Sequence, residues 1–323
     1  MKHTALVRAA ATTVVAGLAL VCANLALSPG AQADLGERAH LQLPPPDWTP
    51  PSWHPQPQAL MGLPSMDGEV AEGRAPRLRS RSAFVYDLDA DQVLLEKNAD
   101  DRRPVASLTK FVSSLAMATE AVDLDQRVCV DELFWPSRSG ARSKFSTGEC
   151  YLGWDLLGSA LVASDNRAAY GLAVSSGLDY YQFIDRMDEV SVQLGMEQSS
   201  WADPSGLEDE NLSTARDMSK AAVAVATHPT LSMAASARSW HVEKVKEIGV
   251  GPKQRLLYTT NRASGRSDVD FLAAKTGYTD TARYCFTSVV RTDDGRTLAI
   301  TLLGAPRSRD RWSDLDRVLR WVQ

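Results

Sequence analysis

The chain has 323 residues, of which 44% are hydrophobic, 23% charged and 7% aromatic, which is typical of a globular protein and excludes a disordered or fibrous one. Its 35 basic residues are outnumbered by 40 acidic ones, giving a net charge of −5. A nucleic acid is therefore not an expected partner, because phosphate binding needs a basic surface.

The first 33 residues have the pattern of a targeting segment. Lys2 and Arg8 precede an apolar stretch from Ala9 to Leu27, and Ala31-Gln32-Ala33 follows it. A basic start, an apolar run and an A-x-A site predict a secretory signal peptide over residues 1–33. The alternative is an uncleaved membrane anchor, since the run is close to the ~20 residues that span a bilayer. We expect an exported protein, located in the periplasm or the extracytoplasmic cell-wall space.

A proline-rich segment follows. Nine of the 16 prolines lie between Pro44 and Pro76, and such a stretch forms neither a helix nor a central strand. Residues 34–79 are predicted to be an extended linker, and residues 80–323 one folded domain.

The domain holds Cys129, Cys150 and Cys285. An exported protein can keep disulfides, and Cys129 with Cys150 is the plausible pair. The alternative is three buried thiols that pack as small apolar groups. The paired C-x-x-C spacing of a structural zinc site is absent from the sequence.

Within the domain, hydrophobic patterning predicts strands at both ends and helices between them. Ser213 is predicted to cap the fourth helix. The predicted strands are 83–88, 92–96, 271–276, 284–291 and 297–303, and the predicted helices are 111–121, 151–161, 166–174, 214–226 and 313–322.

This order is not the alternation of a parallel α/β sheet. It predicts an α+β fold in which an antiparallel sheet of about five strands joins both ends of the domain, flanked by helices. The last helix carries Asp314, Asp316, Arg317 and Arg320 on its polar face. It is therefore expected to pack on the sheet rather than anchor the chain to a membrane.

One tetrapeptide combines a nucleophile with a base. In Ser107-Leu108-Thr109-Lys110 the serine and lysine are three residues apart, so on a helix they share a face. Lysine can take the serine proton if burial and nearby cations lower its pKa. Taken alone, the pair could equally be two solvated side chains on a surface helix.

Two further motifs follow in order. Ser164-Asp165-Asn166 lies at the start of a predicted helix, and Lys275-Thr276-Gly277 lies at the end of a predicted strand. The three motifs together resemble those of the penicillin-binding proteins and serine β-lactamases. The resemblance implies a β-lactamase/transpeptidase-like fold, with a helical subdomain beside the sheet.

The resemblance extends over residues 82–323 and is strongest to the low-molecular-mass D-alanyl-D-alanine peptidases. Asp203-Pro204-Ser205-Gly206-Leu207 is similar to a segment of these enzymes. Ser164 to Ala169, together with Cys285, resembles the D-alanyl-D-alanine endopeptidase branch, which cuts cross-links between peptidoglycan stems. Ala282-Arg283-Tyr284 departs from the Ala-Gly that relatives usually have there.

This resemblance implies a role for each catalytic residue. Ser107 would attack the D-alanyl carbonyl, and Lys110 would be its base. Ser164 would pass the proton to the leaving amine. Asn166 would hold the substrate amide and help to position Lys110. Lys275 would add positive charge that favours a neutral Lys110.

The remaining site residues are expected to bind substrate. The backbone N–H groups of Ser107 and Tyr278 would form an oxyanion hole, with Gly277 in the binding strand. Thr276 and Arg216 would contact the substrate carboxylate. For Arg216 the alternative is a structural ion pair at a helix end.

The implied partners are peptidoglycan stem peptides, with β-lactam antibiotics as covalent inhibitors, and the protein is expected to associate peripherally with the cell wall. No metal or organic cofactor is expected. Alternatives are a DD-carboxypeptidase that removes terminal D-alanine, a serine β-lactamase, and a non-catalytic wall-binding protein. Residues 208–212 lack the Glu-x-x-Leu-Asn order of β-lactamases that have a deacylating glutamate.

Overall fold

The computed structural model describes residues 62–71, 73–120, 122–130, 143–244 and 254–323. The predicted signal peptide at residues 1–33 lies outside the described residues, as does most of the predicted linker. In the described part of the chain, no helix has the length and apolarity needed to cross a bilayer.

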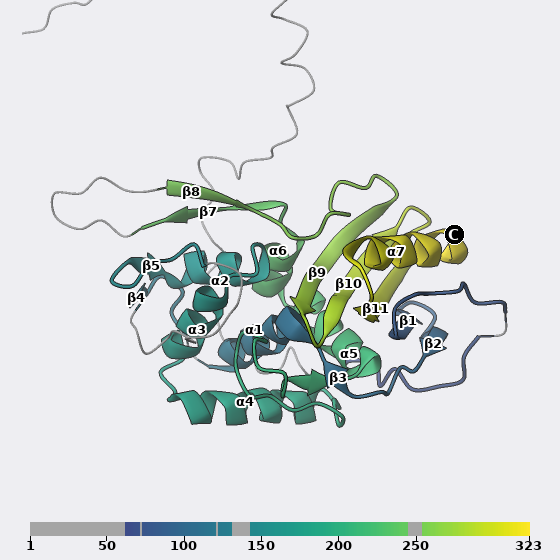
Figure 1. The fold of residues 1–323 in the computed structure, drawn as a ribbon, viewed down its shortest axis with the longest axis horizontal. Coiled ribbons are helices and arrows are strands. Elements are labelled where there is room, and N and C mark those ends of the chain that lie inside the picture. Colours follow the sequence, from purple (N-terminus) through teal and green to yellow (C-terminus); the bar gives the residue numbers. More distant parts are fainter. Residues whose placement is uncertain (1–61, 72, 121, 131–142, 245–253) are drawn as a thin grey trace, which may run out of the picture. The chain divides into compact units, whose positions relative to one another are not determined.

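An antiparallel sheet of five strands joins the two ends of the domain (Figure 1). Its order is β2-β1-β11-β10-β9, and β1 pairs directly with β11. The predicted α+β fold with a sheet of about five strands is therefore confirmed. The strands are β1 (Ser82–Asp87), β2 (Gln92–Lys97), β9 (Val269–Thr279), β10 (Arg283–Thr292) and β11 (Thr297–Ala305).

Helices cover both faces of this sheet. The closing helix α7 contacts β10 and β11, as predicted, while α5 contacts β1, β10 and β11. Helix α6 contacts both β9 and α5, and α1 contacts α2, α3, α4 and α5 (Figure 1). The helices are α1 (Thr109–Thr119), α2 (Gly153–Leu161), α3 (Asn166–Ser175), α4 (Tyr180–Gln193), α5 (Ala215–Thr227), α6 (Pro229–Ser236) and α7 (Ser308–Val322).

Strand β1, which lies between β2 and β11, is buried along its whole length. Phe84 and Tyr86 belong to the apolar core shared with α1 and α5, whereas Ala83 and Val85 belong to the core shared with α7. Successive side chains of a strand point to opposite faces. The four middle positions, 83–86, are therefore all hydrophobic because both faces are covered.

Helix starts follow local capping chemistry. The Asp165 carboxylate accepts the N–H of Ala168 at the start of α3. Asp179 and Gln182 form a capping box on α4. Thr214 caps α5 by accepting the N–H of Asp217. The predicted cap, Ser213, is wrong by one residue, since it lies in the short strand β6 (Leu212–Ser213).

Several short elements were not predicted. The expected helix at 151–161 begins only at Gly153, because the preceding residues form β5 (Cys150–Leu152), which pairs with β4 (Arg127–Cys129). Helices α4 and α6 were also not predicted from the sequence. Also unpredicted were a hairpin of β7 (Ser239–Glu243) and β8 (Gln254–Tyr258), and the short strand β3 (Arg103–Pro104), which pairs with β6.

Packing of the domain starts inside the segment that was predicted to be linker. Met66 is fully buried in the core, and its carbonyl accepts a hydrogen bond from Arg216 at 2.6 Å. Val70 forms a parallel bridge to Val93. The described residues from Met66 onward therefore belong physically to the folded domain.

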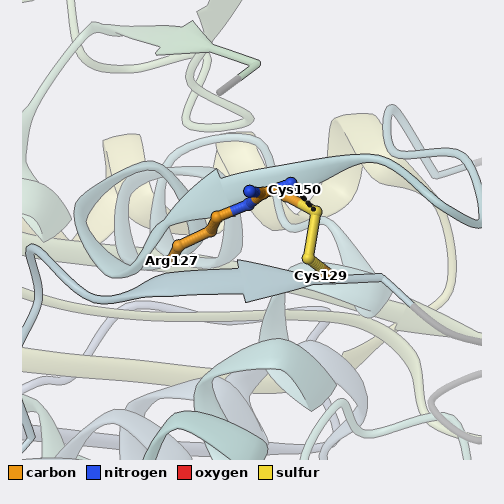
Figure 2. Close-up of a disulfide and its surroundings, with 3 residues drawn as sticks. All are labelled: Arg127, Cys129 and Cys150. Atoms are coloured by element: carbon orange, nitrogen blue, oxygen red, sulfur yellow. Dashed lines mark hydrogen bonds between the residues drawn. A yellow bond between two sulfur atoms is a disulfide. The ribbon is translucent and has the colours of Figure 1, made fainter. Parts of the chain in front are cut away.

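A disulfide joins Cys129 to Cys150 across the β4–β5 pair (Figure 2). Arg127, on the same small sheet, donates a hydrogen bond to the Cys150 sulfur at 3.1 Å. The plausible pairing is thus confirmed. Cys285 is a buried free thiol.

Candidate active site

Ser107 lies in a 3₁₀ turn, Ala106–Leu108, that leads directly into α1. Ala106, which precedes the serine, has a φ of +51°, a strained value for a residue with a side chain. Strain of this kind persists only where the surroundings enforce it. Here the turn presents the serine two residues before α1, whose first turn holds its partner, Lys110.

Lys110 is 1% exposed, and its amine lies 2.9 Å from the Ser107 hydroxyl. The same amine donates to Asn166 Oδ1 at 2.8 Å and to the Ser205 carbonyl at 2.6 Å. Both of these oxygens are pure acceptors, so they take the two hydrogens of a neutral amine. The lone pair is then left to accept the Ser107 O–H.

Burial lowers the pKa of Lys110 to about 8, while the carboxylates of Asp203 and Asp165 oppose that change. The neutral form is therefore within reach near physiological pH. We expected the charge of Lys275 to favour a neutral Lys110. The dominant cause in the structure is instead desolvation of the buried amine.

Ser164 and Lys275 form the second pair. The Lys275 amine donates to Ser164 Oγ at 2.7 Å and to the Thr276 carbonyl at 3.0 Å. Burial first, and then repulsion from Lys110 and Arg311, holds the pKa of Lys275 well below its ordinary value. Ser164 has a φ of +59°, so its backbone is also held in the left-handed region.

The strand β9 carries the third motif past the nucleophile. A Cβ placed on Gly277 would lie 2.8 Å from the Val105 carbonyl oxygen and 3.2 Å from the Ser107 nitrogen. Only a glycine permits this approach of the two backbones. The Thr276 hydroxyl donates to Thr260 Oγ1 at 2.6 Å, and the Tyr278 ring, which follows, is 46% exposed.

The segment 203–206 contributes a support that the sequence analysis did not assign. One Asp203 oxygen accepts the N–H groups of Ser205 and Gly206, and the other accepts from Asn211. This carboxylate, which is fully buried, fixes the turn that presents the Ser205 carbonyl to Lys110. An Asp followed three residues later by Gly is a sequence signal for such a turn.

Arg216 is placed differently from the other predicted site residues. Its guanidinium forms ion pairs with Glu96 and Asp100 and donates to the Met66 carbonyl. These contacts are the structural ion pair that was its alternative role. The contacts found for Arg216 thus all lie at the start of α5 and in the segments around it. The other predicted site residues are brought together in the structure: Ser107, Lys110, Ser164, Asn166 and the strand segment Lys275–Tyr278.

Arg311 is a second residue that sequence reasoning missed. It is 6% exposed, and it donates to the carbonyl oxygens of Gly277 at 3.3 Å and Cys285 at 2.7 Å. Gly277 and Cys285 are direct partners in the β9–β10 pairing. The guanidinium of α7 therefore joins the two strands at the site. Arg311 lies outside the three motifs and follows the last of them by more than thirty residues, so no local sequence pattern indicates that it supports the site.

A serine hydroxyl next to a buried, weakly basic lysine, with a second lysine–serine pair beside it, defines an active-serine hydrolase with a lysine base. The chain matches the D-alanyl-D-alanine carboxypeptidase family over residues 69–306. It therefore belongs to this family, the S11 peptidases, which are serine hydrolases of D-alanyl peptides.

Individual relatives agree with this assignment. The chain is 28% identical to a D-alanyl-D-alanine endopeptidase of Escherichia coli over 77% of this chain and 78% of the relative. It is 29% identical to a D-alanyl-D-alanine endopeptidase of Pseudomonas aeruginosa, over 76% and 78%. A D-alanyl-D-alanine carboxypeptidase of Bacillus subtilis is 26% identical, over 74% and 61%.

Solved structures confirm the fold. A Streptomyces DD-transpeptidase superposes with a TM-score of 0.71 at 21% identity, covering 77% of this chain and 98% of its own. A D-alanyl-D-alanine carboxypeptidase from Mycobacterium tuberculosis superposes with a TM-score of 0.69 at 24% identity, covering 79% and 96%. The predicted β-lactamase/transpeptidase-like architecture is thus confirmed.

Proposed function

We propose that this serine D-alanyl-D-alanine peptidase is an exported endopeptidase that cleaves D-alanyl cross-links between peptidoglycan stems. The observation that carries the chemistry is the placement of the Lys110 amine between Ser107 Oγ, Asn166 Oδ1 and the Ser205 carbonyl. The bond specificity is supported by the two relatives at 28% and 29% identity, which are named as endopeptidases. Removal of a terminal D-alanine is the alternative.

Acylation begins at Ser107. The lone pair of neutral Lys110 takes the hydroxyl proton as the serine oxygen attacks the D-alanyl carbonyl. Lys110 keeps its hydrogen bonds to Asn166 and Ser205 when it becomes protonated, because an ammonium has three hydrogens to donate. The base is therefore positioned in both of its protonation states.

The leaving amine receives its proton from the other side of the site. Ser164 Oγ accepts a hydrogen bond from Lys275 at 2.7 Å. Its hydroxyl hydrogen can therefore move to the amine while the Lys275 ammonium passes a proton to Ser164 Oγ. An anionic substrate favours the protonated form of Lys275, which then supplies a positive charge to it. Asn166 binds the substrate amide and also keeps its hydrogen bond with Lys110.

The oxyanion of the tetrahedral intermediate is stabilised by the backbone N–H groups of Ser107 and Tyr278. The close approach of Gly277 to the Ser107 nitrogen supports this arrangement, because it brings the two segments side by side. One such donor typically contributes ~3–4 kcal/mol to the transition state. Thr276 contacts the substrate carboxylate, and water then hydrolyses the acyl-enzyme.

Penicillin labelling tests the nucleophile. Intact-mass and peptide mass spectrometry should show a persistent penicilloyl adduct on Ser107, and a Ser107→Ala variant should carry none while it keeps its fold. Rapid turnover of penicillin would favour the β-lactamase alternative. Full lytic activity of Ser107→Ala on cell walls would favour the non-catalytic alternative.

Digestion of purified cross-linked muropeptide dimers tests the bond. An endopeptidase converts dimers into monomers without first releasing free D-alanine. Release of D-alanine from pentapeptide ends, with the dimers left intact, would show that the protein is a carboxypeptidase. A matched Ser107→Ala digestion excludes a contaminating hydrolase.

Export rests on the signal pattern at residues 1–33, and the Cys129–Cys150 disulfide supports an oxidising compartment. N-terminal sequencing of the secreted protein should begin at Asp34. Recovery of an intact N-terminus in the membrane fraction would instead support the uncleaved anchor. Peripheral contact with the cell wall would follow from the substrate itself.

A further inference from the structure

Tyrosines make up all the strongly exposed aromatic side chains in the described ranges. They are Tyr180, Tyr181, Tyr258 and Tyr278, with exposed fractions between 42% and 79%. Tyr278 directly follows the Lys275–Gly277 motif. Tyr180 and Tyr181 are the first two residues of α4, and the chemistry described above gives them no role.

Tyr180 and Tyr181 continue a row of rings that begins in the protein interior. Tyr170 is 8% exposed and stacks on Tyr180, with the ring centroids 6.3 Å apart. The rings of Tyr180 and Tyr181 meet edge to face at 5.5 Å. The row therefore runs from a buried ring to one that is 79% exposed.

This row is attached to two segments that contact Lys110. Tyr170 lies four residues after Asn166 on α3, so the two side chains share one helix face about one turn apart. The Tyr180 hydroxyl donates to the Ala202 carbonyl at 2.6 Å, three residues before Ser205. The exposed rings are thus held beside the catalytic site by fixed contacts on both sides.

The surroundings decide which ligand these rings suit. Burial, together with the negative charges of Asp203 and Glu208, raises the pKa of Tyr180. Asp203 and Glu208 disfavour an anionic ligand at this position. A rigid tyrosine ring offers a large apolar face at little entropic penalty, and a neutral ligand with flat, C–H-bearing faces complements it.

We propose that Tyr180 and Tyr181 form a subsite for the neutral amino-sugar rings to which the stem peptide of the substrate is attached. This inference rests on the proposed function, which makes the substrate a peptide carried by a glycan strand. Three to four extended stem residues span roughly 10–14 Å. This reach is comparable with the row of rings, which takes two steps, of 6.3 Å and 5.5 Å, from Tyr170 to Tyr181. A sugar ring stacks on Tyr181, and the stem leads from it to Ser107.

Paired substrates test the subsite. One is a cross-linked dimer that keeps its disaccharides, and the other is the same dimer after an amidase has removed them. For Tyr181→Ala we expect KM on the sugar-bearing dimer to rise about five- to tenfold with kcat unchanged. KM on the sugar-free dimer and the rate of penicillin acylation should not change.

Two control variants sharpen this test. Tyr181→Phe keeps the ring and should behave as wild type. Val192→Ala removes another strongly exposed apolar side chain from α4 and should have no effect. Equal KM values of wild type and Tyr181→Ala on the sugar-bearing dimer, or equal rises on both substrates, would overturn the subsite. Failure of the wild type to cut either dimer, with penicillin acylation intact, would instead contradict the proposed endopeptidase function.

Discussion

Replacing Gly206 by alanine should disable the nucleophile without touching any catalytic side chain. Gly206 has a φ of +81°, and a Cβ placed on it would lie 2.0 Å from the Ala106 carbonyl oxygen and 2.9 Å from the Ser107 nitrogen. A carbon and an oxygen normally approach no closer than about 3.3 Å. The turn at 203–206 and the turn at Ala106 must therefore separate by about 1 Å.

Two effects of this substitution are separable. The left-handed backbone alone destabilises an alanine by about 1–2 kcal/mol. Displacing Ser107 by about 1 Å relative to Lys110 lowers the acylation rate by roughly a hundredfold. Stopped labelling with a fluorescent penicillin measures that rate, and thermal unfolding measures the stability.

Gly295→Ala is the matched control. Gly295 has a φ of +90° in the turn between β10 and β11, and no atom lies within 4 Å of the position its Cβ would take. This variant shares the backbone strain but not the steric overlap, so it should lose stability and keep its acylation rate. If Gly206→Ala acylates as fast as Gly295→Ala, the contact with Ala106 does not position the nucleophile.

Three further outcomes are expected. Burial lowers the pKa of Lys110 to about 8, so the neutral base accumulates as the pH rises. The rate of penicillin acylation should therefore increase about tenfold between pH 7 and pH 9 and then level off. A rate that keeps increasing to pH 10.5 would indicate a lysine with an ordinary pKa. A double variant with Cys129→Ser and Cys150→Ser opens a loop with a sequence separation of 21. Urea unfolding should show that the free energy of unfolding falls by about 3 kcal/mol, with the rate of penicillin acylation unchanged. An unchanged free energy of unfolding would mean that the disulfide hardly restricts the unfolded chain. Arg216→Ala removes ion pairs to Glu96 and Asp100. The free energy of unfolding measured in urea should therefore fall by about 1–3 kcal/mol, while acylation stays at the wild-type rate. A selective loss of acylation would restore the substrate-binding role.

The motif residues were predictable because their chemistry is local or recurrent. The three-residue spacing of Ser107 and Lys110 brings the two side chains together across the 3₁₀ turn and the first turn of α1, whatever the rest of the fold. The strands β10 and β11 were equally visible, because buried strands give apolar runs bounded by a tight turn.

Other features depended on long-range contacts or on signals that were overlooked. The acidic partners of Arg216 lie 116 and 120 residues away in sequence, so no spacing argument reveals them. Helix α4 did carry a signal, since Phe183, Met187 and Val190 form its buried stripe. The burial that sets the pKa of Lys110 is a property of the assembled core.

The pairing of β1 with β11 has a consequence for the order in which this chain can fold. Phe84 lies opposite Thr301, so the central pair of strands closes a loop of more than two hundred residues. Contacts of such separation form late, because the entropy of loop closure must be overcome first. The helices that carry Ser107, Lys110 and Asn166 are local and can form early, but Lys275 reaches Ser164 only when β9 joins β10. The enzyme therefore becomes competent for hydrolysis only after its C-terminal strands have joined the sheet. This timing would suit the proposed export, in which the chain crosses a membrane from its N-terminus.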